Sequence, residues 1–348
     1  MEPHDSIMLR EIREQPEALQ RVLDLELERS AELAAAARAS RVTMLFIAGR
    51  GTSDHAAIYA KYLGEIVTGL PVALAAASVF TLYNARVRLD SALVLGISQS
   101  GKAADANEVL RRAREDGRLT GCITNDPDSV MAATAEYPLF CRAGVEKSLP
   151  ATKTYTTSLA VVYALIACLA ERPDLLDDLK RIPELVSNAL AREEEVADHA
   201  ERYRYMEECV VLARGINQCS AMETALKLSE TSYLRAQPFS AADFLHGPIA
   251  VIDEGYPCLL FAPDGPGIET MVELADALEK RRAEMLVLSD HPDLLRRATK
   301  TLPMPPAPEL LTPIVGIVIS QLFAYHLARV KGRDPDRPRG LQKVTHTF

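Results

Sequence analysis

The stretch from residue 91 to residue 110, SALVLGISQSGKAADANEVL, constrains the fold more than any other part of the sequence. Residues 91–97 form a short apolar run typical of a buried strand in a parallel sheet, and the composition becomes helical after Ala103. Between them lies the turn Ser98-Gln99-Ser100-Gly101. A strand, a hydroxyl-rich turn and a helix N-terminus suit a phosphate monoester, because the first helical N–H groups lack partners and the helix dipole is positive there. The alternative is an ordinary strand-to-helix turn with good capping residues.

Strand-like apolar runs alternate with helical segments along the chain. This alternation predicts an α/β fold, with parallel sheets covered by helices on both faces and ligands at the carboxyl ends of the strands. Strands are expected at 42–48, 71–77, 91–97, 121–124, 137–141, 209–213, 251–252, 258–262 and 285–289. Helices are expected at 8–40, 55–67, 158–171 and 219–234, with a charged helical connection at 174–205.

The two halves of the chain resemble each other. Residues 46–65 and 211–230 both run from a strand through Arg-Gly into a helix that carries Lys and ends in Glu, which predicts an internal duplication. The second copy has FAPDGPG (261–267) where the first has its serine turn, so we expect one phosphate site per chain. The expected organisation is an N-terminal helical segment (1–40), a first domain (41–173), a helical connection (174–205), a second domain (206–332) and a C-terminal tail (333–348).

Composition and charge exclude several classes of protein. With 48% hydrophobic and 25% charged residues, the chain has the composition of a soluble globular protein, and its net charge of −9 argues against nucleic acid or an anionic membrane as the main partner. The six cysteines form no CxxC pair, which predicts reduced, buried thiols in a cytoplasmic protein. We expect no signal peptide and no membrane span, and we interpret 158–170 and 314–330 as buried helices.

Several side chains could carry chemistry. Glu223, Lys227 and Glu230 share one helix face, either as a solvated charged stripe or as an active-site group. His246 lies in a short turn and Lys343 in the tail, where each could equally be structural or exposed. Together with a phosphate site they would equip a sugar-phosphate isomerase. A carboxylate can move a proton between C1 and C2, an acid/base pair can open the ring, and an amine can form a Schiff base with the ketose carbonyl.

A set of motifs extends this interpretation. From about Met8 to Phe348 the chain resembles the double-SIS (sugar isomerase) family, in particular the isomerase half of glucosamine-6-phosphate synthase. The motifs that carry the resemblance are EIREQPEAL (11–19), GRGTS (49–53), ISQSGKAAD (97–105), ATKTYTT (151–157), ETALKLSETSY (223–233), HGP (246–248) and QLFAYHLARVKGRDPDRPRGLQKV (321–344). The resemblance implies two tandem flavodoxin-like three-layer α/β/α domains, with no metal or cofactor.

The resemblance also implies roles for individual residues. Glu230 would be the proton-transferring base, with Glu223 and Lys227 in its network, and Lys343 would face the open-chain sugar carbonyl. His246 would open the ring in the site of the neighbouring subunit, so the active unit would be a homodimer. The residues expected to hold the sugar phosphate are Thr52, Ser53, Ser98, Gln99 and Ser100.

The sequence departs from the family pattern near the substrate. Ala103 replaces a phosphate-binding Thr, Lys102 replaces a Glu, and the loop 148–151, which includes Leu149 and Ala151, is bulkier than usual. The N-terminus has no Cys nucleophile of a glutaminase. We therefore expect conversion of glucosamine 6-phosphate to fructose 6-phosphate and ammonia. The alternatives are deglycation of a phosphorylated ketoamine, another phosphosugar isomerisation, or a non-catalytic sugar-phosphate sensor.

Overall fold

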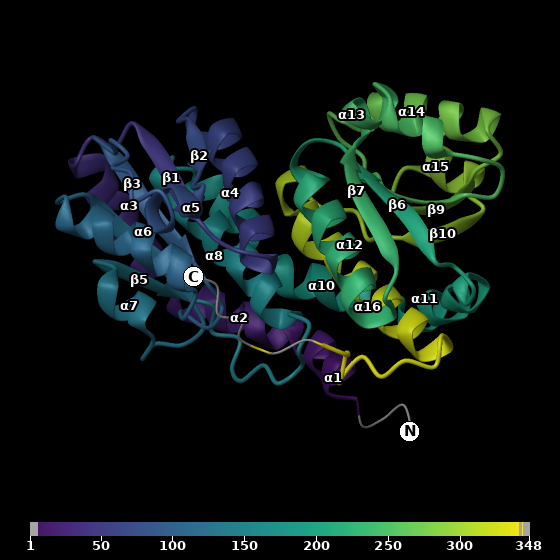
Figure 1. The fold of residues 1–348 in the computed structure, drawn as a ribbon, viewed down its shortest axis with the longest axis horizontal. Helices are drawn as coiled ribbons and strands as arrows, with labels where there is room; N and C mark the ends of the chain where they lie inside the picture. Colours follow the sequence, from purple (N-terminus) through teal and green to yellow (C-terminus); the bar gives the residue numbers. More distant parts are fainter. Residues whose placement is uncertain (1–5, 341–342, 344–348) are drawn as a thin grey trace. The chain divides into compact units, whose positions relative to one another are not determined.

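The computed structural model describes residues 6–340 and residue 343. The chain divides into two compact units, each built on one parallel sheet (Figure 1). Among the described residues, the first-sheet unit comprises 14–146, 151–183 and Lys343, and the second-sheet unit comprises 6–13, 147–150 and 184–340.

The first-sheet unit has five parallel strands in the order β2-β1-β3-β4-β5. Helices α5, α6 and α7 cover Phe46, Val94 and their neighbours on one face, whereas α3, α4 and α8 pack together on the other. The strands are β1 (Met44–Ala48), β2 (Val72–Leu74), β3 (Ala92–Ile97), β4 (Leu119–Thr124) and β5 (Tyr137–Phe140). The helices are α2 (Gln15–Leu25), α3 (Leu27–Ala39), α4 (Thr52–Thr68), α5 (Ala77–Thr81), α6 (Ala104–Glu115), α7 (Val130–Thr134), α8 (Lys153–Leu169) and α9 (Pro173–Leu179).

The second-sheet unit repeats this topology. Counted from the β7 edge, its strand order is β7-β6-β8-β9-β10, which matches the order β2-β1-β3-β4-β5 of the first sheet strand for strand. This match confirms the predicted duplication. The strands are β6 (Glu208–Ala213), β7 (Arg235–Ser240), β8 (Pro257–Phe261), β9 (Glu284–Ser289) and β10 (Lys300–Pro303). The helices are α1 (Ile7–Arg13), α11 (Glu193–Ala200), α12 (Gln218–Ser232), α13 (Ala241–Leu245), α14 (Ile268–Lys280), α15 (Pro292–Arg297) and α16 (Thr312–Val330), with short 3₁₀ turns η2 (Glu201–Tyr203), η3 (Gly215–Asn217), η4 (Pro248–Val251) and η5 (Glu309–Leu311). Helix α10 (Ile182–Leu190) begins in residues of the first-sheet unit and continues in the second.

Some element predictions were wrong. The expected helix 8–40 is three helices, interrupted at Glu14 and at the buried Glu26, whose carboxylate accepts the Phe140 N–H and pairs with Arg142. Residues 251–252 are not a strand, since Val251 ends η4. Strands β7 and β10 were missed. Both are sheet-edge strands that contain proline, a residue that sheets tolerate at their edges.

Helix α8 begins at Lys153, earlier than expected. The hydroxyls of Thr157 and Ser158 donate to the carbonyls of Lys153 and Thr154, so polar side chains are satisfied inside its first turns. Residues 309–330 are long and apolar enough to cross a membrane, contrary to the expectation that no run reaches that length, but 89% of the apolar window is buried inside the structure. The prediction of buried helices is therefore confirmed for both segments.

The cysteines are as predicted. All six are free thiols, and five of them are buried. Burial raises the pKa of the Cys122 and Cys209 thiols to about 12, so these groups are neutral packing residues.

Candidate active site

The predicted phosphate turn lies at the point where the strand order of the first sheet reverses. Strands β1 and β3 are neighbours, with Ala48 opposite Gly96, although β2 lies between them in sequence. The loops 49–53 and 98–101 therefore leave the same sheet edge side by side. In open α/β sheets this crevice is where ligands bind.

Backbone hydrogen bonds to its carbonyl oxygens hold the 98–101 turn in place. Gly101 N–H donates to the Ser98 carbonyl at 3.0 Å, and Asn125 N–H donates to the Gln99 carbonyl at 3.0 Å. Met131 N–H donates to the Gly101 carbonyl at 3.2 Å. These three hydrogen bonds fix the backbone conformation of the turn.

Gly101 cannot carry a side chain in this conformation. Its φ is +62°, and a Cβ atom would lie 2.1 Å from the Ser129 Oγ. Ser129 is itself fixed, because its Oγ accepts the Ala132 N–H at the start of α7. The turn therefore needs glycine for both its backbone angle and its packing.

Two helices begin at this crevice, α4 with Thr52 and Ser53 and α6 with Ala104. Within the described residues, neither helix has a side-chain cap: the N-cap positions are Gly51 and Ala103. Alanine is among the poorest N-caps, so the N–H groups of α6 are well suited to an external anion.

Arg50 and Asp105 connect the two loops. The buried Asp105 lies in the first turn of α6, and its Oδ2 accepts hydrogen bonds from Arg50 Nη2 at 2.6 Å and Nε at 3.0 Å. The guanidinium offsets a carboxylate that would otherwise repel an anion at this helix end. Sequence analysis missed this pair, whose members are 55 residues apart.

The residues that depart from the family pattern are also located. Lys102 is exposed beside the turn, Ala103 is the N-cap of α6, and Leu149 and Ala151 are half-buried. The loop before Leu149 is held in the second-sheet unit by the buried Glu11, whose carboxylate accepts the N–H groups of Lys147 at 2.6 Å and Ser148 at 3.0 Å. Glu11 belongs to the EIREQPEAL motif and was not predicted to have this role.

Glu223, Lys227 and Glu230 meet on α12 and are not a solvated stripe. Lys227 and Glu223 are fully buried, with Nζ 3.3 Å from the Glu223 Oε1 and 2.5 Å from the Glu230 Oε2. Burial would lower the pKa of Lys227, but the two carboxylates outweigh it and raise the pKa above its usual value. Glu230 keeps 21% of its side chain exposed, so it is the acidic member of the group that a substrate can reach.

His246 and Lys343 differ in their surroundings. His246 follows α13 and is exposed. Lys343 lies in the first-sheet unit, where its Nζ donates to the Glu146 Oε2 at 2.8 Å. The predicted residues thus form two groups: the phosphate turn and Lys343 in the first-sheet unit, and Glu223, Lys227, Glu230 and His246 in the second.

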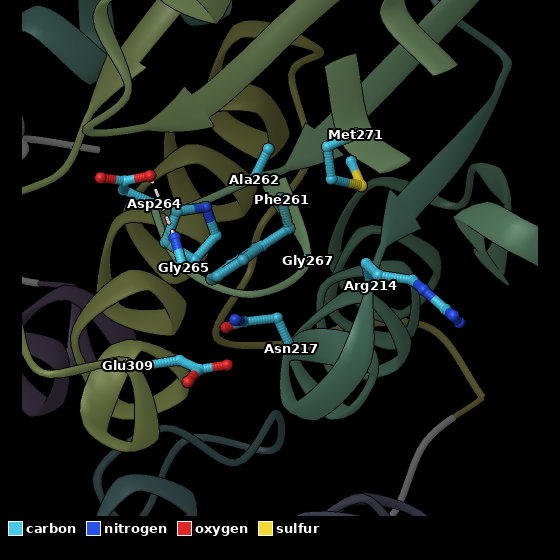
Figure 2. Close-up of a pocket in the computed structure, with 10 residues that line it drawn as sticks. Arg214, Asn217, Phe261, Ala262, Asp264, Gly265, Gly267, Met271 and Glu309 are labelled. Carbon is cyan, nitrogen blue, oxygen red and sulfur yellow. Dashed lines mark hydrogen bonds between the residues drawn. The ribbon is translucent and has the colours of Figure 1, made fainter. Parts of the chain in front are cut away.

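The equivalent crevice of the second sheet is different (Figure 2). It lies after β6 and β8 and holds a cavity of about 20 Å³, lined by Arg214, Asn217, the 261–267 loop and Glu309 among others. Burial raises the pKa of Glu309. A small cavity with a carboxylate in its wall is a poor phosphate site, which agrees with the absence of a serine turn here.

The fold defines a class: a tandem of flavodoxin-like α/β domains, with the predicted phosphate turn at the crevice of the first sheet. The SIS domain family matches this chain twice, at residues 40–168 and 206–331. The chain belongs to the SIS domain family.

Known proteins support this assignment. A glutamine–fructose-6-phosphate aminotransferase [isomerizing] of Thermococcus kodakarensis is 36% identical over 98% of this chain, which spans 58% of that relative's length. A protein of Silicibacter pomeroyi assigned to the phosphosugar isomerases is 35% identical, with a TM-score of 0.86, covering 95% of this chain and 100% of that one. The C-terminal domain of a glucosamine–fructose-6-phosphate aminotransferase from Francisella tularensis has a TM-score of 0.87 at 27% identity, covering 96% of this chain and 98% of that one.

Proposed function

We propose that this chain is an aldose–ketose isomerase of amino-sugar phosphates that converts glucosamine 6-phosphate and water to fructose 6-phosphate and ammonia. The observation that carries the proposal is the contact of Glu230 with the buried Lys227, 2.5 Å apart. A relative's name supplies the substrate class, since the Thermococcus kodakarensis protein is named for fructose 6-phosphate. We assign the deaminating direction because it needs only water besides the sugar phosphate.

The phosphate turn anchors the substrate. Ser98, Gln99 and Ser100 precede the N-terminus of α6, where N–H groups and the helix dipole favour a dianion. Lys102 adds an exposed cation beside the turn, which offsets the hydroxyl that Ala103 lacks. Fixing the phosphate orients C1 and C2, so binding energy from the far end of the sugar serves the reaction.

Glu230 moves the proton. Lys227 holds its Oε2, and the other carboxylate oxygen takes the proton from C2 of the open-chain sugar and returns it to C1. The 2-amino group then becomes an imine, to which water adds as ammonia leaves. The amine of Lys343 can exchange with this imine to form a Schiff base that water hydrolyses.

His246 opens the sugar ring in a partner copy of the chain. Its exposed position after α13 supports this assignment. Mixing Glu230→Gln chains with His246→Asn chains tests it, because a mixed dimer would contain one site with both native residues. Recovery of up to about a quarter of wild-type activity is expected, and no recovery would place His246 in its own chain's site.

The decisive assay is ammonia release from glucosamine 6-phosphate by wild type and Glu230→Gln. We expect kcat to fall by about 10² or more in the variant while binding of the sugar phosphate is kept. Tight binding with no turnover in either protein would make the chain a sensor, whereas equal turnover in the two proteins would remove Glu230 from the proton transfer. Phosphorylated ketoamines and other hexose phosphates in the same assay establish whether deglycation or simple isomerisation is faster.

A further inference from the structure

We propose that Glu146 is the positioning residue of Lys343, which it holds in the first-sheet unit through an ion pair with a fully buried carboxylate. This inference rests on the proposed function, in which the Lys343 amine meets the sugar carbonyl. Glu146 was not among the residues predicted from sequence. It lies just before the 147–151 loop.

The Glu146 carboxylate is enclosed at the start of α8. Its side chain has no exposed surface. Its Oε1 accepts the N–H groups of Thr152 at 2.9 Å and Thr154 at 3.1 Å, and the Thr152 hydroxyl at 3.3 Å. Thr152 is the N-cap of α8 but provides no cap with its own side chain, so Glu146 supplies an acceptor for this helix end.

The second oxygen is the one that receives the lysine. Oε2 accepts the Thr154 hydroxyl at 2.8 Å and the Lys343 Nζ at 2.8 Å. Burial would raise the pKa of Glu146, but the charge and hydrogen bond of Lys343 and the two backbone N–H groups outweigh it and lower the pKa. A fully buried carboxylate is therefore ionised, and Lys343 is its cation.

Glu146 shares a cavity with the phosphate turn. Gln99 of the turn and Glu146 line one cavity of about 550 Å³ in the first-sheet unit. Chain ends usually fray unless a contact holds them. An ion pair keeps the amine within the unit that carries the phosphate turn, which lowers the entropic cost of bringing it to the sugar carbonyl.

The first test measures the reactivity of Lys343 without turnover. Wild type and Glu146→Gln are treated with limiting acetic anhydride, and acetylation of Lys343 is followed by tryptic mass spectrometry, with the exposed Lys102 as the internal reference. We expect Lys343 to be acetylated about fivefold faster in the variant. Thr154→Val is the matched control, because it removes the other hydrogen bond to Oε2 and leaves the cation, so protection should persist. Equal rates in wild type and Glu146→Gln would overturn the inference.

A pair of Lys343 variants tests the contact if Glu146→Gln does not fold. Lys343→Arg keeps a cation for Glu146, whereas Lys343→Met does not. Trypsin should cleave after Arg339 several times faster in Lys343→Met than in Lys343→Arg, because the tail is released. Equal cleavage would contradict anchoring by the ion pair.

Kinetics then separate positioning from a structural role. If Glu146 acts through Lys343, Glu146→Gln lowers kcat more than it changes KM. In a Lys343→Ala background, Glu146→Gln then lowers kcat no further. Additive losses would overturn the inference. Full activity of Lys343→Ala would show that the reaction does not use Lys343, and the proposed positioning role of Glu146 would then fail. If wild type turns over none of the sugar phosphates, the proposed function fails, while the acetylation result still decides whether Glu146 holds Lys343.

Discussion

The guanidinium of Arg50 lies 2.6 Å from the carboxylate of Asp105 and joins the loop after β1 to the first turn of α6. Only 6% of the Asp105 side chain is exposed, whereas half of the Arg50 side chain is. A buried negative charge at the positive end of a helix opposes the binding of an anion there. The arginine therefore neutralises the charge of Asp105, so the dipole of α6 can favour the binding of a phosphate.

Arg50→Ala should weaken sugar-phosphate binding by about tenfold, because Asp105 then faces the crevice uncompensated. Calorimetric titration with fructose 6-phosphate measures the change. The control is Arg111→Ala on α6, the helix that carries Asp105. It removes a surface pair with Glu108 and should leave affinity unchanged. Adding Asp105→Asn to Arg50→Ala should recover part of the loss. A double variant that binds no better than Arg50→Ala would show that Arg50 acts in another way.

Gly101→Ala should abolish phosphate binding and destabilise the protein by about 1–3 kcal/mol, from strain at positive φ and the clash with Ser129. Gly117→Ala is a matched control. Its φ is similar, +69°, and it lies in the same unit, but a Cβ there would have nothing within 4 Å. Gly117→Ala therefore introduces the backbone strain without a steric clash. Urea unfolding and phosphate titration of both variants give the comparison. Equal losses of stability in the two would rule out the Ser129 contact as the cause.

Sequence periodicity predicted the parallel sheets and the turn at 98–101, because those signals are local. Apolar runs that end in hydroxyls and glycine mark strands and their loops whatever the rest of the chain does. The missed strands β7 and β10 lie at sheet edges, where polar residues and proline are tolerated and the apolar signal is weak.

The parts of the site that sequence reasoning missed depend on contacts between distant residues. Glu146 and Lys343 are 197 positions apart, and Glu11 meets Lys147 across 136 positions. No local pattern distinguishes such a carboxylate from a surface one. Burial is the property that makes it functional, and burial follows from the packing of the whole unit.

Lys227→Met should destabilise the protein by about 3–5 kcal/mol, because the fully buried Glu223 loses the ammonium 3.3 Å away. Urea unfolding at pH 7 measures this. Lys180→Met is the control: it breaks an exposed pair with Asp177 and should cost less than about 1 kcal/mol. The double variant Glu223→Gln/Lys227→Met should regain most of the stability and none of the activity. A mild effect of Lys227→Met alone would mean that Glu223 is neutral in the native protein.

Acid should weaken the second-sheet unit through Glu193. Burial would raise the pKa of this carboxyl, but hydrogen bonds from His326 and from Arg13, whose Nη2 is 2.8 Å away, lower it to about 2. A lowered pKa contributes stability above the unfolded value of about 4.5, and this contribution is lost as the pH falls toward 2. The difference in unfolding free energy between wild type and Glu193→Gln should therefore be on the order of 2 kcal/mol at pH 7 and shrink between pH 4.5 and pH 2. Urea titrations across that range measure it, with Glu195→Gln, a partly exposed neighbour on α11, as the control for removing a carboxylate from this helix. A difference that is constant with pH would mean that Glu193 titrates alike in the folded and unfolded states.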